Sequence, residues 1–284
     1  MKRFSISQLE RFSDIKPHTI RTWENRYGLL NPERSAGNTR YYTLDDLERL
    51  LDISLLNQYG GKIKKLSILS NEELKVLAAR LGTPWAKFQN SLNRLIISLY
   101  KSDIEQFECI LDDIARNAGM PDTIKHLIVP FLEKTDILSY KDSAVEIHFA
   151  VTAIRKKLLV GIDQAKPETN KKRKAVLFLP EGEHYDLILL IMYYCLKCEG
   201  VMVYYLGTNI SQNNLESIIL SKSPNELFVY TVSPKKYHFE TLNMFLDHSS
   251  PLTMLTIVTA DQITENHSNR VKFTHYSSFL AAKR

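Results

Sequence analysis

The chain has 284 residues, of which 44% are hydrophobic and 24% are charged, and it carries a formal net charge of +5. This length suits two or three domains, and the composition is that of an ordinary globular protein. The chain lacks an apolar run of the roughly 18 residues that a membrane helix requires, and its first residues lack the apolar core of a signal peptide. We therefore expect a cytoplasmic protein without a membrane span.

The three cysteines, Cys109, Cys195 and Cys198, are too few and too unevenly spaced for a disulfide framework. Cys195 and Cys198 form a single CxxC motif within an apolar segment of helical character. A structural zinc site needs four ligands, and no second CxxC or close histidine pair completes one here. We expect this pair to pack in the core, and we expect no metal site.

The first 60 residues predict two short helices, a small hairpin and a longer helix. Ser5 or Ser7 is suited to capping the first helix. Pro17 fits the first turn of the second helix, which should end at Tyr27 because Gly28 suits a left-handed residue after a helix. A turn around residues 35–38 predicts the hairpin, and Thr43 is placed to cap the longer helix.

Basic side chains outnumber acidic ones in this segment. Residues 1–41 contain four acidic residues and eight basic ones, namely Lys2, Arg3, Arg11, Lys16, Arg21, Arg26, Arg34 and Arg40. The second helix would turn Ile20, Trp23 and Tyr27 toward the first and leave polar residues outward, as a helix that reads base edges requires. The hairpin could then grip the phosphate backbone. The predicted DNA contacts are His18, Thr19, Arg21, Thr22, Asn25, Arg26, Arg34, Arg40, Tyr41 and Tyr42.

The string HTIRTWENRYGLLNPERSAGNTRYY resembles the head of MerR-type transcriptional regulators. Their pattern is roughly T-I-R-x-W-E-x-R-Y-G-L-L-x-P-x-R, followed by a wing with R-x-Y, and the resemblance covers residues 4 to about 57. It implies a winged helix-turn-helix that binds duplex DNA, and self-association as a dimer or higher oligomer. Metal-sensing members carry cysteines just after the head, and here none precedes Cys109.

The remaining chain predicts an all-α helical bundle and then a doubly wound α/β domain with a parallel sheet. Helical spacing runs from about residue 62 to 163, with breaks near residues 82–84, 119–121 and 140–141. The polar stretch 166–174 has the composition of a linker. Four β-rich runs, at residues 175–180, 201–206, 226–232 and 252–258, then alternate with helical segments. We therefore divide the chain into a head (1–75), a bundle (76–165) and a Rossmann-like domain of the cobalamin-binding type (166–284).

This layout resembles the cobalamin-dependent CarH/LitR photoreceptor regulators. In those relatives a Glu-x-His-x-x-Gly loop follows the first strand, and its histidine ligates cobalt. Here Tyr185 falls on the histidine position and Ile188 on the glycine position, with His184 one residue early. Ile137 and Ile147 replace the tryptophan and glutamate that cap the corrin beside His148, and the relatives' Gly-Gly pair is missing near residues 258–261.

These departures predict a degenerate cleft without adenosylcobalamin. Its candidate lining residues are His148, Glu183, His184, Tyr185 and Thr231, and packing or capping roles are the competing interpretation of each. The α/β domain would then be a sensor for another small ligand, a protein-contact module or an oligomerisation module. The alternative is a cobalamin-dependent light-sensing repressor that uses His184. We find no nucleophile–base pair and no phosphate loop, so we expect no enzyme; Asp261 and His267 are too poorly placed to support one.

Overall fold

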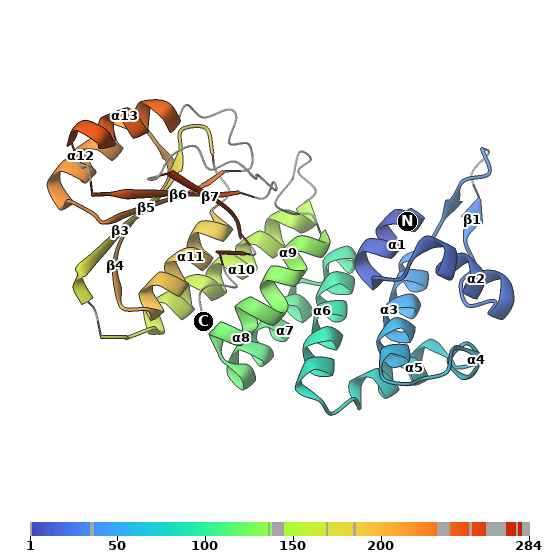
Figure 1. Cartoon of the computed structure of the whole chain (residues 1–284). Coiled ribbons are helices and arrows are strands. Elements are labelled where there is room, and N and C mark those ends of the chain that lie inside the picture. The colour runs from blue at the N-terminus through green and yellow to red at the C-terminus, as the bar shows by residue number, and fades with distance from the viewer. Residues whose placement is uncertain are drawn as a thin grey trace. The chain divides into compact units, whose positions relative to one another are not determined.

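A computed structural model describes residues 2–34, 37–135, 137, 145–168, 170–183, 186–231, 239–249, 252–259, 271–276 and 278–279 (Figure 1). The chain forms two compact units. The first comprises Met1–Ile137 with Ser143–Ala150, and the second comprises Leu138–Asp142 with Val151–Arg284. In the described part of the chain, none of the helices has the length and apolar character that a membrane crossing requires.

The first unit begins with the predicted winged helix-turn-helix. Its elements are α1 (Ile6–Ser13), α2 (Pro17–Tyr27), the antiparallel strands β1 (Glu33–Arg34) and β2 (Arg40–Tyr41), α3 (Leu44–Gln58), α4 (Ile63–Leu66) and α5 (Asn71–Ala79). Ser5 and Thr43 cap α1 and α3 as expected, each in a reciprocal capping box. Gly28 ends α2 with a φ of 58°. The local signals for this head are confirmed.

The helices that follow complete the first unit. They are α6 (Pro84–Lys101), α7 (Ile104–Ala118), α8 (Met120–Thr123), a π-helical turn (Ile124–Ile128), α9 (Val129–Thr135) and the start of α10 (Val145–Gln164). The breaks expected near residues 82–84 and 119–121 are present, and the one near 140–141 lies outside the described residues. Phe4 and Phe12 of the head pack edge-on against Tyr100 of α6, so head and bundle share one core.

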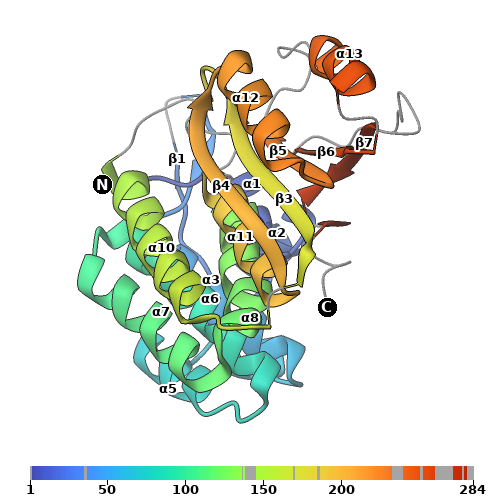
Figure 2. The ribbon, with the colours of Figure 1, turned by 90° about the vertical axis from the view of Figure 1, so that its left-hand side faces the viewer.

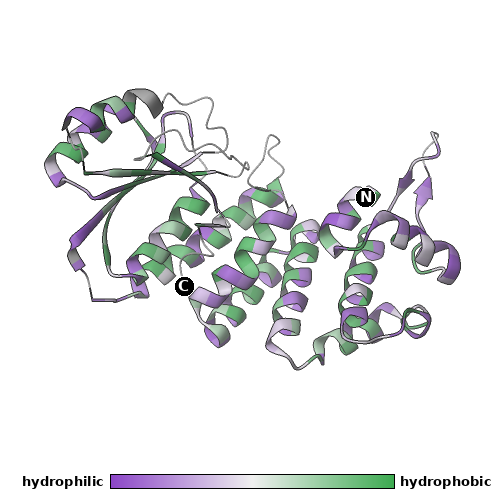
Figure 3. Ribbon diagram, in the orientation of Figure 1, coloured by the Kyte–Doolittle hydropathy of each residue, from purple (hydrophilic) through white to green (hydrophobic). Residues whose placement is uncertain are grey.

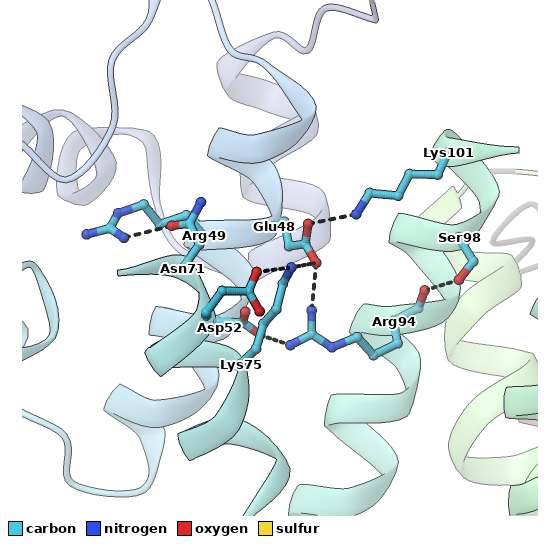
Figure 4. A network of polar contacts seen from close by, with 9 residues as sticks. Glu48, Arg49, Asp52, Asn71, Lys75, Arg94, Ser98 and Lys101 are labelled. Carbon is cyan, nitrogen blue, oxygen red and sulfur yellow. Dashed lines mark hydrogen bonds and ion pairs between the residues drawn. The ribbon is translucent and has the colours of Figure 1, made fainter. Parts of the chain in front are cut away.

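Helix α3 is buried on several sides and brings two carboxylates into that core (Figure 4). Glu48 accepts hydrogen bonds from Arg94 and Lys101, both at 3.0 Å, and pairs with Lys75 at 3.2 Å. Arg94 bonds to Glu48 through Nη1 and to Asp52 through Nη2. These ion pairs tie α3 to α5 and α6, which carry the cations.

The second unit is the expected doubly wound domain. A parallel sheet in the order β4-β3-β5-β6-β7 consists of β3 (Asn170–Pro180), β4 (Val201–Ile210), β5 (Glu226–Thr231), β6 (Met254–Thr259) and β7 (Val271–His275). Helices α12 (Gln212–Lys222) and α13 (Phe239–Ser249) cover one face, and α11 (Leu187–Cys198) covers the other (Figures 1 and 2). The division of the chain into three domains stays a prediction.

Two local expectations for this unit were wrong. The predicted linker 166–174 joins the sheet from Asn170 onward, because the Asn170 N–H bonds to Gly200 and Arg173 pairs with Glu226 at 2.7 Å. Strand β7 was missed, since its sequence VKFTH is short and half polar. It forms because β6 offers it an open parallel edge.

The burial of Asp52 should make the stability of the first unit depend on pH. Burial, foremost, and the nearby charge of Glu48 raise the pKa of Asp52 to about 6, although Arg94 opposes this. Between about pH 4 and 6 the folded state then holds a proton that the unfolded chain has released. The free energy of unfolding should therefore fall as pH rises through this window, and Asp52→Asn should remove about 1–3 kcal/mol of that fall.

Urea unfolding at several pH values, followed by tryptophan fluorescence, tests this prediction. Both tryptophans, Trp23 and Trp85, lie in the first unit, so the signal reports that unit. Glu48 contributes in the opposite direction, because Lys101 and Lys75 outweigh the effect of burial and lower the pKa of Glu48. Wild type and variant share this contribution, so it cancels when their pH profiles are compared. Asp45→Asn, at an exposed carboxylate on the same helix, should follow wild type. Parallel pH profiles of Asp52→Asn and wild type would contradict the prediction.

Candidate nucleic-acid interface and C-terminal cleft

Helix α2 presents a polar face to solvent. Ile20 is the buried residue of this helix, and Trp23 and Tyr27 are half-buried. Thr19 is half-buried too, whereas the other predicted α2 contacts are exposed, namely His18, Arg21, Thr22, Asn25 and Arg26. Figure 3 shows the outer part of α2 and the adjoining hairpin as mainly hydrophilic. The exposed face therefore carries donors and acceptors suited to base edges and phosphates.

The hairpin of β1 and β2 lies in sequence directly after α2 and is extended by the N-terminus. Phe4 and Tyr42 exchange both backbone hydrogen bonds at 2.9 Å, which adds a third short strand segment to the hairpin. Arg34 is exposed and donates to Asn38, which adopts a φ of 58° in the turn. Tyr41 is half-buried, and the Arg3 guanidinium lies 6.0 Å from its ring centre.

One carboxylate joins α2 to this wing. The Glu24 side chain is 11% exposed, and it accepts from Arg40 Nε at 3.0 Å and from the Tyr42 hydroxyl at 3.1 Å. Tyr42 itself is 0% exposed, and burial, followed by the charge of Glu24, raises its pKa well above the usual range. A side chain so placed has no surface for the direct DNA contact that the sequence suggested. Its position fits a role in holding the wing against α2.

A second basic segment was missed by the sequence analysis. Lys62, Lys64 and Lys65 are exposed at α4, which belongs to the same compact unit as α2. The signal was present as a charge run after Gly60-Gly61, at a place where lysines are more often simply solvated. What the sequence could not supply is the fold that brings this turn and α2 onto one helix, α3.

In the second unit, the loop after β3 is fixed by its two neighbouring strands. The Gly182 N–H donates to Asn209 Oδ1 at 2.9 Å, at the end of β4. Thr231, at the end of β5, donates to Glu183 Oε1 at 3.1 Å. Glu183 and Thr231 thus meet where the sheet order reverses, which is the place where open α/β sheets bind ligands.

The other candidate cleft residues are not brought together by the described structure. His184 and Tyr185 lie outside the described residues, as do Asp261 and His267. His148 is exposed and belongs to the first unit, together with Ile147 and Ile137. Glu183 and Thr231 are therefore the predicted cleft residues that the described structure brings together.

Helix α11 begins right after this loop, and its first turn is packed and ion-paired. Ile188, which the sequence analysis aligned with the loop glycine, is 0% exposed. Asp186 Oδ1 accepts from Arg155 of α10 at 2.6 and 3.0 Å, and its other oxygen accepts from Tyr205 at 3.4 Å. Burial, and then the charge of Asp186, raise the pKa of Tyr205 above its usual range. These contacts fix the end of the loop.

The expectation of core packing for the CxxC pair was wrong for Cys198, which is exposed in the last turn of α11, while Cys195 is half-buried. The buried residues of this helix are Leu187–Met192, Tyr194 and Leu196, and neither cysteine is among them. No cluster of three or more histidine, cysteine or acidic side chains able to hold a metal occurs among the described residues.

Residues 4–72 match the family described as MerR HTH family regulatory protein. Over 240 residues, the chain is 27% identical to the HTH-type transcriptional repressor CarA of Myxococcus xanthus, a match that covers 82% of this chain and 78% of CarA. It is 22% identical to the repressor CarH of the same organism over 244 residues, covering 82% and 80% of the two chains.

The fold of the chain is similar to that of the monomethylamine corrinoid protein of Methanosarcina barkeri. The TM-score is 0.53 at 15% identity, and the match covers 68% of this chain and 96% of that one. At this identity the similarity concerns the fold alone. Together with the winged head and the parallel sheet, these matches show a MerR-type winged helix-turn-helix at the start of a chain that is similar over most of its length to the transcriptional repressors CarA and CarH.

Proposed function

We propose that the head reads a specific duplex sequence with α2 in the major groove. The observation that carries the proposal is the exposed polar face of α2 beside a wing that is fixed to it through Glu24. Arg21, Asn25 and Arg26 have the forked or bidentate groups that distinguish base pairs. His18, Thr19 and Thr22 would add shorter contacts to bases or sugar-phosphate groups at the same face.

Phosphate contacts would come from both sides of α2. On the wing, Arg34, Arg40 and Tyr41 would contact the backbone, Arg40 while its Nε remains paired with Glu24, and Tyr42 would hold the wing from within. On the other side we add the exposed lysines of α4, Lys62, Lys64 and Lys65. Such contacts fix register and supply affinity without reading sequence. A regulator that binds chromosomal DNA in this way acts in the cytoplasm.

Substitutions should separate the two kinds of contact. Arg21→Ala should weaken binding to the preferred duplex by about 1–3 kcal/mol and lower discrimination against random duplexes. Arg40→Ala should weaken binding to all duplexes similarly and reduce the slope of log affinity against log salt by roughly one unit. Tyr42→Phe should leave DNA affinity within about twofold while lowering stability by about 1 kcal/mol, because it removes a hydrogen bond inside the head.

The preferred duplex is obtained by selection from a random-sequence duplex pool with the full-length protein. Titrations of the variants on that duplex and on a random one, at several salt concentrations, give affinities and slopes. Wild-type behaviour of both arginine variants would contradict the assignment of the interface. A strong loss of DNA affinity in a well-folded Tyr42→Phe variant would restore Tyr42 as a direct contact.

For the α/β unit, we propose a module that senses another ligand or mediates protein contacts, without catalytic activity of its own. Its fold is of the cobalamin-binding type, but the described residues do not fit that cofactor as the CarH/LitR proteins hold it. Ile188 is packed in the interior at the glycine position, and Thr259, near the missing Gly-Gly pair, is 0% exposed. Only glycine would give the close backbone approach that such positions serve.

The protein should therefore not retain adenosylcobalamin. Tyr185 is the residue that the sequence aligns with the cobalt-ligating histidine. A tyrosine hydroxyl, with an ordinary pKa of about 10, is a poor replacement for imidazole as a ligand at neutral pH. Incubation with adenosylcobalamin in the dark, desalting and a visible spectrum test this expectation. Stoichiometric retention of corrin absorbance that His184→Ala abolishes would favour the alternative, a light-sensing repressor with an atypical ligand.

Self-association is also proposed, through residues 76–284 rather than through the head alone. A long heptad helix does not follow the head, where α4 and α5 are short. Pseudo-palindromic sites are read by dimers, whose symmetry matches that of the site. Light scattering should therefore give at least twice the monomer mass for the full chain. A monomeric full-length protein that still binds its preferred duplex would contradict this expectation.

A further inference from the structure

Arg49 of α3 joins three segments of the head through one guanidinium group. Its Nε donates to the Leu29 carbonyl at 3.0 Å, and Nη2 donates to the Ser67 carbonyl at 2.8 Å. Its Nη1 donates to the Leu69 carbonyl at 2.9 Å and to Asn71 Oδ1 at 2.8 Å. Figure 4 shows the contact with Asn71. The planar fork of arginine is suited to several acceptors at once, and a lysine ammonium cannot reproduce it.

The acceptors lie beside the two segments of the proposed DNA interface, at the end of α2 and in the turn after the lysines of α4. Leu29 follows Gly28, the residue that ends α2, and both Leu29 and Leu30 are buried. Ser67 and Leu69 form the turn directly after the lysines of α4, and Asn71 starts α5. Arg49 thus holds the end of α2 and the end of the lysine segment at once.

A neighbouring residue of α3 strengthens this arrangement. Asp46 accepts from the Asn31 N–H at 3.2 Å, so α3 holds the chain just after α2 at two points, Leu29 and Asn31. The acceptors of Arg49 are neutral oxygens, and no ion pair to Arg49 occurs among the described residues. The charge of this side chain is therefore directed to peptide carbonyls, which supports a role in geometry rather than in surface charge.

We propose that Arg49 is a positioning residue that sets α2 and the lysine segment Lys62–Lys65 at the spacing of one DNA duplex. It acts through the backbone of Leu29, Ser67 and Leu69 and does not itself touch DNA. This inference rests on the proposed DNA-reading function of the head. It adds the residue that lets α2 and the lysine segment contact the same duplex.

Arg49→Lys in the full-length protein tests the proposal, because it keeps the charge and removes the fork. The salt dependence of binding to the selected duplex should fall by about 1–3 units of slope, as if lysine contacts had been deleted. Arg80→Lys is the matched control, since Arg80 is an exposed arginine at the end of α5. It should bind as wild type.

A double-mutant cycle measures a coupling energy that a purely structural role of Arg49 would leave at zero. Lys64→Ala with Lys65→Ala should lower affinity by roughly tenfold in the wild-type background and by about twofold or less with Arg49→Lys. Additive losses with an unchanged salt slope would overturn the proposal. If Arg49→Lys fails to fold, Asn71→Ala removes one acceptor and should give the same coupling at smaller size; additivity there would overturn the proposal equally.

These experiments also distinguish a failure of the proposed role of Arg49 from a failure of the proposed DNA-reading function. If Arg21→Ala weakens specific binding while Arg49→Lys has wild-type affinity and slope, the head reads DNA and the role of Arg49 is wrong. If selection with the wild-type protein yields no preferred duplex, the proposed function itself fails.

Discussion

The pairing of two buried carboxylates on α3 is the constraint on which the first unit is built. Glu48 and Asp52 have side chains that are only 8% and 2% exposed, and an unpaired carboxylate at such places would be strongly destabilising. Their cations come from α5 and α6, so α3 can be buried only when those helices are in place. The same helix carries Arg49 and Asp46, which hold the chain that follows α2. Head and bundle are thereby assembled around one helix.

The polar residues of α2 divide into two groups in the structure. Arg21, Asn25 and Arg26 are exposed on α2, whereas Glu24 is largely buried and holds Arg40 and Tyr42. A sequence pattern weighs these residues alike. Their burial distinguishes side chains that are available to a ligand from those that fix the wing, and it assigns the carboxylate in this basic surface to the second group.

The architecture of the α/β unit does not depend on the residues of its predicted cleft. A parallel sheet depends on apolar strands and covering helices, and these are fully present in the core around Val176, Phe178, Val229 and Ile257. A cofactor site depends on a few residues in loops, which the fold does not require. The Glu183–Thr231 hydrogen bond uses two cleft residues to join the ends of β3 and β5. The fold of this unit therefore does not by itself determine which ligand it binds.

The sequence by itself determined the head, its capping residues, the breaks between most helices and four of the five strands. These features follow from local chemistry, since a cap, a left-handed glycine or an apolar period acts within a few residues. Tertiary structure alone decided that Tyr42 is buried, that residues 170–174 belong to β3, and that Arg49 joins Leu29 to Leu69. Each of these depends on partners distant in sequence, such as Glu24, Gly200 and the turn after α4, and no local pattern records which side chains will meet.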